Sequence, residues 1–495
     1  MSRINTNVSS LIARNALQGT NASLQTSLQR LSTGLRINKG ADDPAGLIVS
    51  ERLRSEIAGV SQAIDNVERA SNVIATAESS LQEINSLLLS MKSLVLEAAN
   101  TGAFSKDEVK ANQLQIDSAI DSITRIANTT SFAGLKLLNG SLDYITEGVT
   151  GSQITDLTVQ GVNFGTNTSV PVTVEVLNSA ENASLFLSAT GGAGAPTNGS
   201  ALLSSISFEV RGPIGVEVFE FASNTPTSAV AFAINSVRDA VGVSASIVNA
   251  SSIQITSLGF GTDEFVSVNR LDADKNQSFA TVDAPDGNET GRDVGADVLA
   301  LINGNLAVGD GINLALRTST LNLEMTLDKQ AAQITGQTYS FDINGGGATY
   351  QIGPDVTSQQ KVGFGIQSVA ASNLGNSSTG FLSQMRSGGI YSLVSGTDTA
   401  DQARFADGIL DAAIAEISSL RGRIGAFEKN TLQTTLRSSQ VALENLTASE
   451  SQVRDTDFAE ETAKLSRAQV LQQAGTNTLQ IANTSAQNVL ALLGG

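Results

Sequence analysis

Hydrophobic residues recur at strict steps of seven along the N-terminal part of the chain. Repeats at this spacing place their side chains along one side of a helix, where they form a seam that a neighbouring helix covers. We therefore predict one long helix over residues 53–98 that needs a helical partner. Its seam consists of Leu53, Val60, Val67, Ile74, Leu81, Leu88 and Val95.

Shorter rows with spacings of three and four residues lie near both ends of the chain and supply the partners. Any one row is typical of a structural coiled coil and says little about function. Together the rows predict a long antiparallel helical coiled-coil rod built from both termini. The N-terminal row is Leu24, Leu28, Leu31 and Leu35, and the C-terminal row is Ile417, Leu420, Ile424 and Phe427.

Residues 141–400 have a different composition. They contain every proline except Pro44 and 31 of the 45 glycines, so they cannot continue the helical rods. Apolar and polar residues alternate within 172–176, 206–210 and 253–255, which predicts half-buried strands. The whole chain is therefore predicted to be an α+β multidomain protein with a β-rich central insertion.

Two units are predicted inside the central insertion. The first covers residues 205–268 with a short helix at 228–237, and the second covers 293–351. In the second unit we expect a helix at 297–302 and a strand at 339–343. Residues 189–200 are predicted to be an exposed loop, and the three glycines at 345–347 a flexible turn, since no Lys-Ser or Lys-Thr follows as in a phosphate loop.

A break in the helical pattern is expected at residues 40–46. Asp43 is placed to cap a new helix and Pro44 to occupy its first position, where the missing N–H costs nothing. Residues 131–140 contain apolar positions bounded by Asn-Gly, and this pattern predicts a hairpin.

Composition excludes most catalytic chemistry. The chain has no cysteine and no histidine, so thiolate metal sites, histidine bases and histidine-dependent triads are ruled out. Carboxylate or lysine chemistry remains open, but no pair of carboxylates stands out. We therefore predict no enzyme activity, no cofactor and no metal site.

The net charge of the chain limits the classes of partner that it could bind. With 30 basic and 48 acidic residues the net charge is -18, which disfavours binding to a nucleic-acid backbone. The N-terminus lacks a basic segment followed by an apolar core, and no stretch approaches 18 apolar residues. We expect neither a cleaved signal peptide nor a membrane span, so export would need another route.

Four segments carry a resemblance to a known family. Residues 3–7, 32–46, 444–457 and 469–493 closely resemble bacterial flagellin. The resemblance implies a secreted structural protein that polymerises into the extracellular flagellar filament used for motility. It also implies export by the flagellar secretion apparatus.

In flagellins the ends of the chain fold and pack as subunits assemble. The resemblance implies terminal helices at 1–42 and 459–495 in the inner filament core, a helical rod at 43–140 and 401–458, and variable outer domains at 141–400 that include a flagellin-type insertion module at 205–268. The polymerisation residues expected in the terminal helices are Ile4, Val8, Leu11, Leu17, Leu24, Leu28, Leu31, Leu35, Leu465, Leu471, Ile481 and Leu492.

The resemblance also implies partners. These are other copies of the chain, cap and junction proteins, and a secretion chaperone that masks residues 465–493. Flagellins recognised by an innate Toll-like receptor present an arginine, a leucine and an acidic residue, and the equivalent positions here are Ser90, Leu94 and Gln115. Only the leucine is kept, so we expect weak recognition.

Three other interpretations remain. A hook-filament junction protein shares helical termini, but the dense agreement at 32–46 and 444–457 favours the filament subunit. An enzyme carried on a flagellin scaffold lacks a visible catalytic constellation. A coiled-coil signalling rod would have continuous heptads and no strand-rich insertion.

Overall fold

The computed structural model describes residues 7–165, 167–188, 202, 205–249, 252–271, 280–283, 290–318, 320–377, 379–395 and 399–493. It divides into two compact units. The first contains residues 1–71, 351–356 and 428–495, and the second contains residues 72–350 and 357–427. The predicted polymerisation residue Ile4 and the predicted loop at 189–200 lie outside the described residues.

The predicted long helix is present as α2, Pro44–Ala99. The Asp43 Oδ1 accepts a hydrogen bond from the Gly46 amide at 2.9 Å, which confirms the predicted cap and the position of Pro44 at the start of the helix. The predicted seam is also confirmed. The side chain of Leu53 is partly exposed, whereas Ile74, Leu81, Leu88 and Val95 are fully buried.

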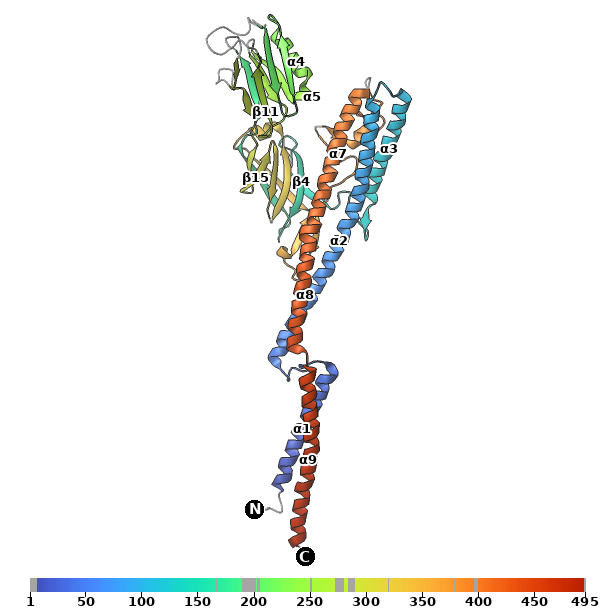
Figure 1. The fold of residues 1–495 in the computed structure, drawn as a ribbon, viewed down its shortest axis with the longest axis vertical. Coiled ribbons are helices and arrows are strands. Elements are labelled where there is room, and N and C mark those ends of the chain that lie inside the picture. Colours follow the sequence, from blue (N-terminus) through green and yellow to red (C-terminus); the bar gives the residue numbers. More distant parts are fainter. Residues whose placement is uncertain are drawn as a thin grey trace. The chain divides into compact units, whose positions relative to one another are not determined.

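In the second unit α2 lies beside α3, Lys106–Thr129, and α7, Thr399–Phe427 (Figure 1). Glu78 of α2 pairs with Arg421 of α7 at 2.8 Å, and Lys92 of α2 pairs with Asp407 of α7 at 3.6 Å. The earlier residue of α2 pairs with the later residue of α7, and the later with the earlier, so the two helices are antiparallel. α7 buries its predicted row at Ile417, Leu420 and Ile424.

The central region of the second unit contains an eight-stranded sheet in the order β3-β18-β5-β14-β15-β16-β17-β4. Its apolar core also receives Ala331 and Ala332 from the short helix α6, Lys329–Gln333. The strands are β3 Tyr144–Glu147, β4 Ile154–Val162, β5 Val170–Asn178, β14 Leu299–Ile302, β15 Asn305–Asp310, β16 Asn313–Arg317, β17 Leu321–Leu327 and β18 Thr338–Gly346.

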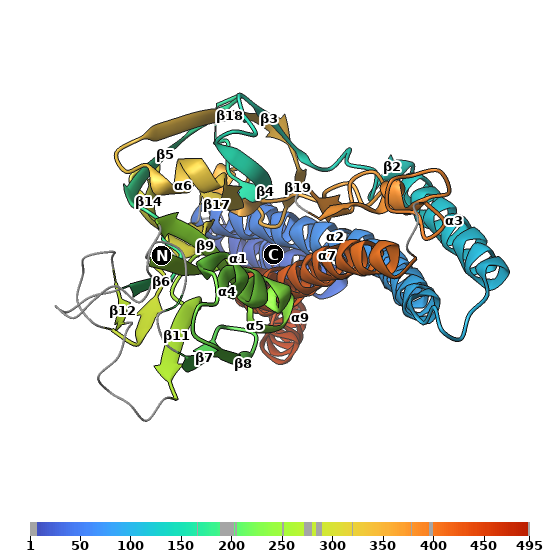
Figure 2. The same cartoon turned by 90° about the horizontal axis from the view of Figure 1, so that it is seen from above.

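Two four-stranded sheets, ordered β12-β6-β10-β9 and β13-β11-β7-β8, share a second apolar core. The helices α4, Thr227–Ser236, and α5, Arg238–Val241, lie beside them (Figure 2). The strands are β6 Ser184–Ser188, β7 Ile206–Arg211, β8 Val216–Phe221, β9 Val243–Asn249, β10 Ser252–Ser257, β11 Phe265–Arg270, β12 Ala280–Val282 and β13 Arg292–Val294. The predicted strands at 172–176, 206–210 and 253–255 and the predicted short helix are confirmed.

The helix predicted at residues 297–302 is wrong. Strand β14 occupies Leu299–Ile302, and burial alternates along it, with Ala300 and Ile302 fully buried between β5 and β15. Alanine and leucine favour helices in isolation, but pairing with two neighbouring strands overrides that preference. The strand predicted at 339–343 is confirmed within β18.

The hairpin predicted at residues 131–140 is present as β1, Ser131–Phe132, paired with β2, Leu135–Lys136. Its turn contains Ala133 and Gly134, which both have positive φ. The remaining short elements are β19 Ala348–Gln351, β20 Lys361–Phe364, β21 Gly375–Asn376, β22 Gly380–Phe381 and the 3-10 turns η1 Ser358–Gln360 and η2 Leu382–Met385.

Two adjacent leucines of α2 provide a matched test of the seam. Leu88 is fully buried, whereas Leu89 is 52% exposed. We expect Leu88→Ala to lower the free energy of unfolding by about 2 to 5 kcal/mol because it leaves a cavity, and Leu89→Ala to change it by less than about 0.5 kcal/mol. Thermal melting followed by helical circular dichroism measures both. Equal effects of the two substitutions would contradict the seam.

Glu416 on α7 predicts a dependence of stability on pH. Desolvation raises the pKa of its carboxyl group to about 7, although the Gly375 amide donates to it and the residue as a whole stays exposed to solvent. A raised pKa means that the folded chain favours the protonated form, so stability present below about pH 4.5 is lost as the pH rises through about 7.

We expect Glu416→Gln to remove this dependence of stability on pH. The melting temperature of the unchanged chain should fall between pH 5 and pH 8 relative to that of the variant. Because the side chain is partly exposed, the difference should correspond to about 1 kcal/mol. A slope that is identical in both chains would show that Glu416 does not cause it.

Candidate assembly surface

The terminal segments pair in the first unit. Helix α1, Val8–Thr33, lies antiparallel to α9, Phe458–Leu493 (Figure 1). Asn7 caps α1 by accepting from the Ser10 amide at 3.0 Å, and its Nδ2 donates to the Ala482 carbonyl of α9 at 2.9 Å. The same unit contains α8, Gln433–Arg454, which follows a π-turn at Glu428–Leu432.

Small side chains form the fully buried apolar part of the contact between α1 and α9. Ala13, Ser27 and Ala468 are buried, and a Cβ placed on Gly475 would lie 3.2 Å from Leu17 Cδ1. Small residues let the two helices approach closely, but they bury little apolar area. The pair therefore gains only modest stability from its own contact.

The large apolar side chains of the same two helices are mostly directed elsewhere. Ile481 is 67% exposed and Leu471 is 51% exposed. Val8, Leu11 and Leu28 are exposed as well, while the predicted polymerisation residues Leu17, Leu24, Leu31, Leu35 and Leu465 are partly buried. The side chain of Leu492 lies outside what the structure describes.

The sequence prediction missed three exposed apolar residues on these helices. Ile12, Phe458 and Val470 are 65%, 58% and 69% exposed. They fall outside the rows with spacings of three and four, so a search for one seam passes over them. With the other exposed side chains they define the terminal apolar surface, which consists of Val8, Leu11, Ile12, Leu28, Phe458, Val470, Leu471 and Ile481.

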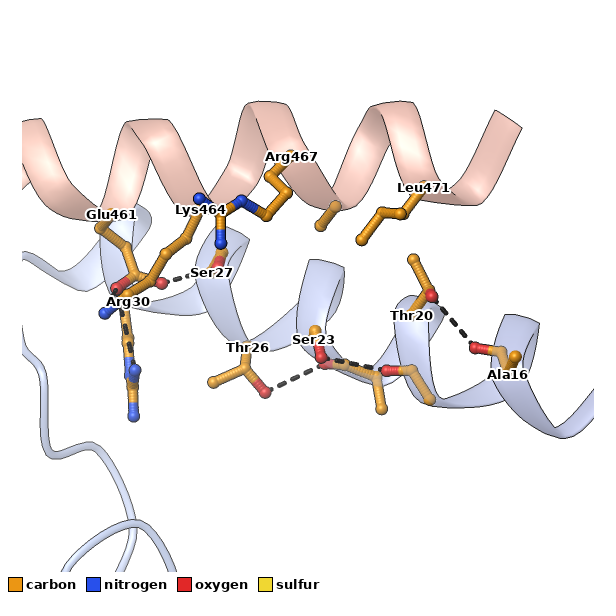
Figure 3. Close-up of a pocket in the computed structure, with 13 residues that line it drawn as sticks. Ala16, Thr20, Ser23, Thr26, Ser27, Arg30, Glu461, Lys464, Arg467 and Leu471 are labelled. Atoms are coloured by element: carbon orange, nitrogen blue, oxygen red, sulfur yellow. Dashed lines mark hydrogen bonds and ion pairs between the residues drawn. The ribbon is translucent and has the colours of Figure 1, made fainter. Parts of the chain in front are cut away.

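A buried charged cluster joins the two helices at one level. Glu461 of α9 is only 4% exposed, and the Ser27 hydroxyl of α1 donates to its Oε1 at 2.6 Å (Figure 3). The Arg30 Nη1 lies 3.8 Å from Glu461 Oε2, and the Lys464 Nζ lies 3.6 Å from the same oxygen. The apolar rows gave no sign of this cluster. Ser27 and Arg30 lie three residues apart and so share one face of α1, but the sequence does not show which residue of α9 lies opposite them.

An open groove of about 690 Å³ runs between α1 and α9 (Figure 3). The hydroxyls of Thr20, Ser23 and Thr26 donate to carbonyls of their own helix, so they offer few free donors to a ligand. Small residues such as Gly19 and Ala22 also line the groove. Its shape and chemistry suit packing by another helix better than binding of a small molecule.

Nothing in the described part of the chain suggests catalysis at a metal centre. Among the described residues, no three carboxylates gather closely enough to hold a metal ion. In the same residues, no helix combines the length and the apolar character needed to cross a bilayer.

The three positions predicted for receptor recognition lie in the second unit. Ser90 and Gln115 are exposed on α2 and α3, and Leu94 is partly buried. The Asn112 side chain of α3 donates to the Leu94 carbonyl at 3.5 Å, so the two helices meet beside these residues.

Comparisons with known proteins match both ends of the chain. The family described as the bacterial flagellin N-terminal helical region matches residues 4–143, and the bacterial flagellin C-terminal helical region matches residues 408–493. The B-type flagellin of Pseudomonas aeruginosa is 30% identical over 99% of this chain and 99% of its own length. A flagellin of Salmonella typhimurium is 27% identical with the same coverage.

A solved structure of FliC from Burkholderia pseudomallei is also similar. The identity is 14%, and the match covers 73% of this chain and 98% of that chain. Its TM-score of 0.23 is too low to support an argument about the fold.

Proposed function

Because the chain belongs to the bacterial flagellin family and is a structural subunit of the flagellar filament, we propose that it polymerises through the paired helices α1 and α9. Flagellins are structural proteins that self-polymerise in the extracellular filament used for motility. The relatives give no support to the junction-protein alternative.

The terminal apolar surface is the observation that supports this assignment. Eight large apolar residues of α1 and α9 stay exposed, although each helix has the other as a partner. Adjacent exposed apolar residues, such as Leu11 beside Ile12 and Val470 beside Leu471, can provide a site of protein association. Packing against equivalent helices of other copies would remove them from water, and each fully buried side chain would contribute about 1.5 to 3 kcal/mol.

Folding of these helices is proposed to be coupled to polymerisation. The fully buried apolar residues of their mutual contact are small, the leucines beside them are only partly buried, and polar-diluted helices are marginally stable alone. Neighbouring copies would supply the missing burial. Hydrogen exchange that showed full protection of both ends in a dilute monomer would argue against this coupling.

The proposed layers follow the predicted boundaries. Residues 1–42 and 459–495 would form the inner filament core, and residues 43–140 and 401–458 the coiled-coil rod, whose antiparallel contacts between α2 and α7 support it. Residues 141–400 would form the outer domains, with the flagellin-type module at 205–268. The separate apolar cores of the β-sheets are consistent with such domains.

The terminal apolar surface also implies that the chain has a binding partner before it assembles. An exposed apolar helix is a liability inside the cell, so a secretion chaperone that covers residues 465–493 would prevent early association. Export would use the flagellar secretion apparatus without a cleaved signal peptide. Cap and junction proteins would contact the chain at the ends of the filament.

We predict that exposed apolar residues of α9 are needed for polymerisation. The double variant Leu471→Ser with Ile481→Ser should form far fewer filaments, because both side chains belong to the terminal apolar surface. Val308→Ser is the matched control, since Val308 is 73% exposed on β15, outside the terminal helices. Seeded polymerisation followed by pelleting and electron microscopy measures the yield.

A copy that lacks residues 459–495 should form no filaments in the same assay. Normal filaments from that copy, or from the double variant, would contradict polymerisation through these helices. Loss of filaments in the Val308 control would instead point to a general loss of folding.

We also predict weak activation of the Toll-like receptor for flagellin. An arginine and a carboxylate that could each supply charge-assisted hydrogen bonds of about 1.5 to 3 kcal/mol are replaced by Ser90 and Gln115. Ser90→Arg combined with Gln115→Glu should raise reporter-cell activation by at least about tenfold. Ser93→Arg combined with Gln115→Glu is the control, because Ser93 is also exposed on α2. Full activation by the unchanged chain would overturn the prediction.

A further inference from the structure

We propose that Glu461 fixes the axial register of α1 against α9. The proposal rests on the proposed function only in that the register would determine how the terminal apolar surface is presented to other copies. Its physical basis lies within one chain, in the contact that Ser27 and the partly buried Arg30 make with the buried carboxylate of Glu461.

The contact between the two helices otherwise specifies register weakly. Apart from this cluster, the residues buried between α1 and α9 are small, such as Ala13 and Ala468. Alanine, glycine and serine recur along α1 at positions 13, 16, 19, 22 and 23. A displacement of one helical turn would exchange one small side chain for another at these positions, at little cost in packing. The same displacement would move the partly buried Leu17 from Gly475 to Leu471 or Leu479, so packing at this one point also favours the observed register.

The cluster responds differently to the same displacement. A shift of four residues in one direction places Ser23 and Thr26 where Ser27 and Arg30 now lie. A shift in the other direction places Leu31 and Gly34 there. Either shift takes the guanidinium of α1 away from a carboxylate that is 4% exposed.

After either shift Glu461 would keep Lys464 of its own helix, whose side chain is 50% exposed, but would lose the hydroxyl and the guanidinium that reach it from α1. A buried carboxylate that loses such partners is destabilised, whereas an intact buried pair adds little net stability. This asymmetry makes such a pair effective in excluding wrong alignments, as buried polar residues do in coiled coils. The Arg30 Nε is buried without a hydrogen-bond partner in the described structure. Such an orphaned group indicates that the cluster is not optimised for stability, and register is the role that fits it.

The absence of cysteine from the chain allows a direct measurement of register. An ideal Cβ at Gly475 lies 3.8 Å from Leu17 Cβ, which matches the spacing of a disulfide. Leu17→Cys with Gly475→Cys therefore reports the observed register. Leu17→Cys with Leu471→Cys, or with Leu479→Cys, reports a shift of one turn in either direction. A glutathione buffer lets each disulfide reach equilibrium, so the yields report populations even where pairing is transient.

In the chain with Glu461 we expect the 17–475 disulfide to dominate over both shifted pairs. Glu461→Gln should raise the yield of at least one shifted pair relative to 17–475 by about tenfold, because the amide no longer requires Arg30. Arg30→Gln should have the same effect. The control is Glu444→Gln, which removes an exposed carboxylate of α8 in the same unit and should leave the ratio unchanged.

Equal yields of in-register and shifted disulfides in the unchanged background would overturn the proposal. So would a ratio that Glu461→Gln does not alter. Helical circular dichroism of each variant shows whether its helix content is retained. If Glu461→Gln loses helix, Arg30→Gln tests the same contact in its place. Failure of polymerisation through the ends would appear in the filament assay, which is independent of the disulfide ratios.

Discussion

The pairing of helices from opposite ends of the chain is the interaction on which the other features depend. α2 cannot bury its seam alone, and the charged contacts to α7 show which partner covers it in the second unit. The β-rich segment lies between α3 and α7 in sequence. Because the entropy cost of closing a loop grows only slowly with its length, the helices can tolerate a very large insertion at this point.

The degree of burial separates the two kinds of helical contact. In the second unit the α2 seam is fully covered at Ile74, Leu81, Leu88 and Val95. In the first unit the fully buried apolar residues between α1 and α9 are small, and the large apolar residues are partly buried or exposed. A fully covered seam stabilises one chain, whereas apolar side chains left in water contribute little to the stability of that chain. The sequence therefore distributes its large apolar residues differently along the two pairs of helices.

Local signals predicted much of the fold. The heptad spacing gave α2, and the Asp43-Pro44 pair gave its first residue, because both depend on neighbours in sequence. Residues 297–302 were misassigned because strand pairing with β5 and β15 is a long-range effect. Glu461 was missed for a related reason. From sequence alone, a polar residue on an amphipathic helix is expected to be exposed to solvent, because the partner helix that buries it is not known.

Affinity and alignment have different physical sources in the terminal helices. Apolar burial is strong but non-directional, so Leu471 and Ile481 could promote association in several alignments. A buried carboxylate contributes little net stability but penalises every arrangement that removes its partner. If Glu461 sets the register of each pair, the apolar side chains of successive copies would reach their neighbours at repeating positions. A helical polymer requires such repetition, since a contact that varied between copies could not propagate a regular lattice.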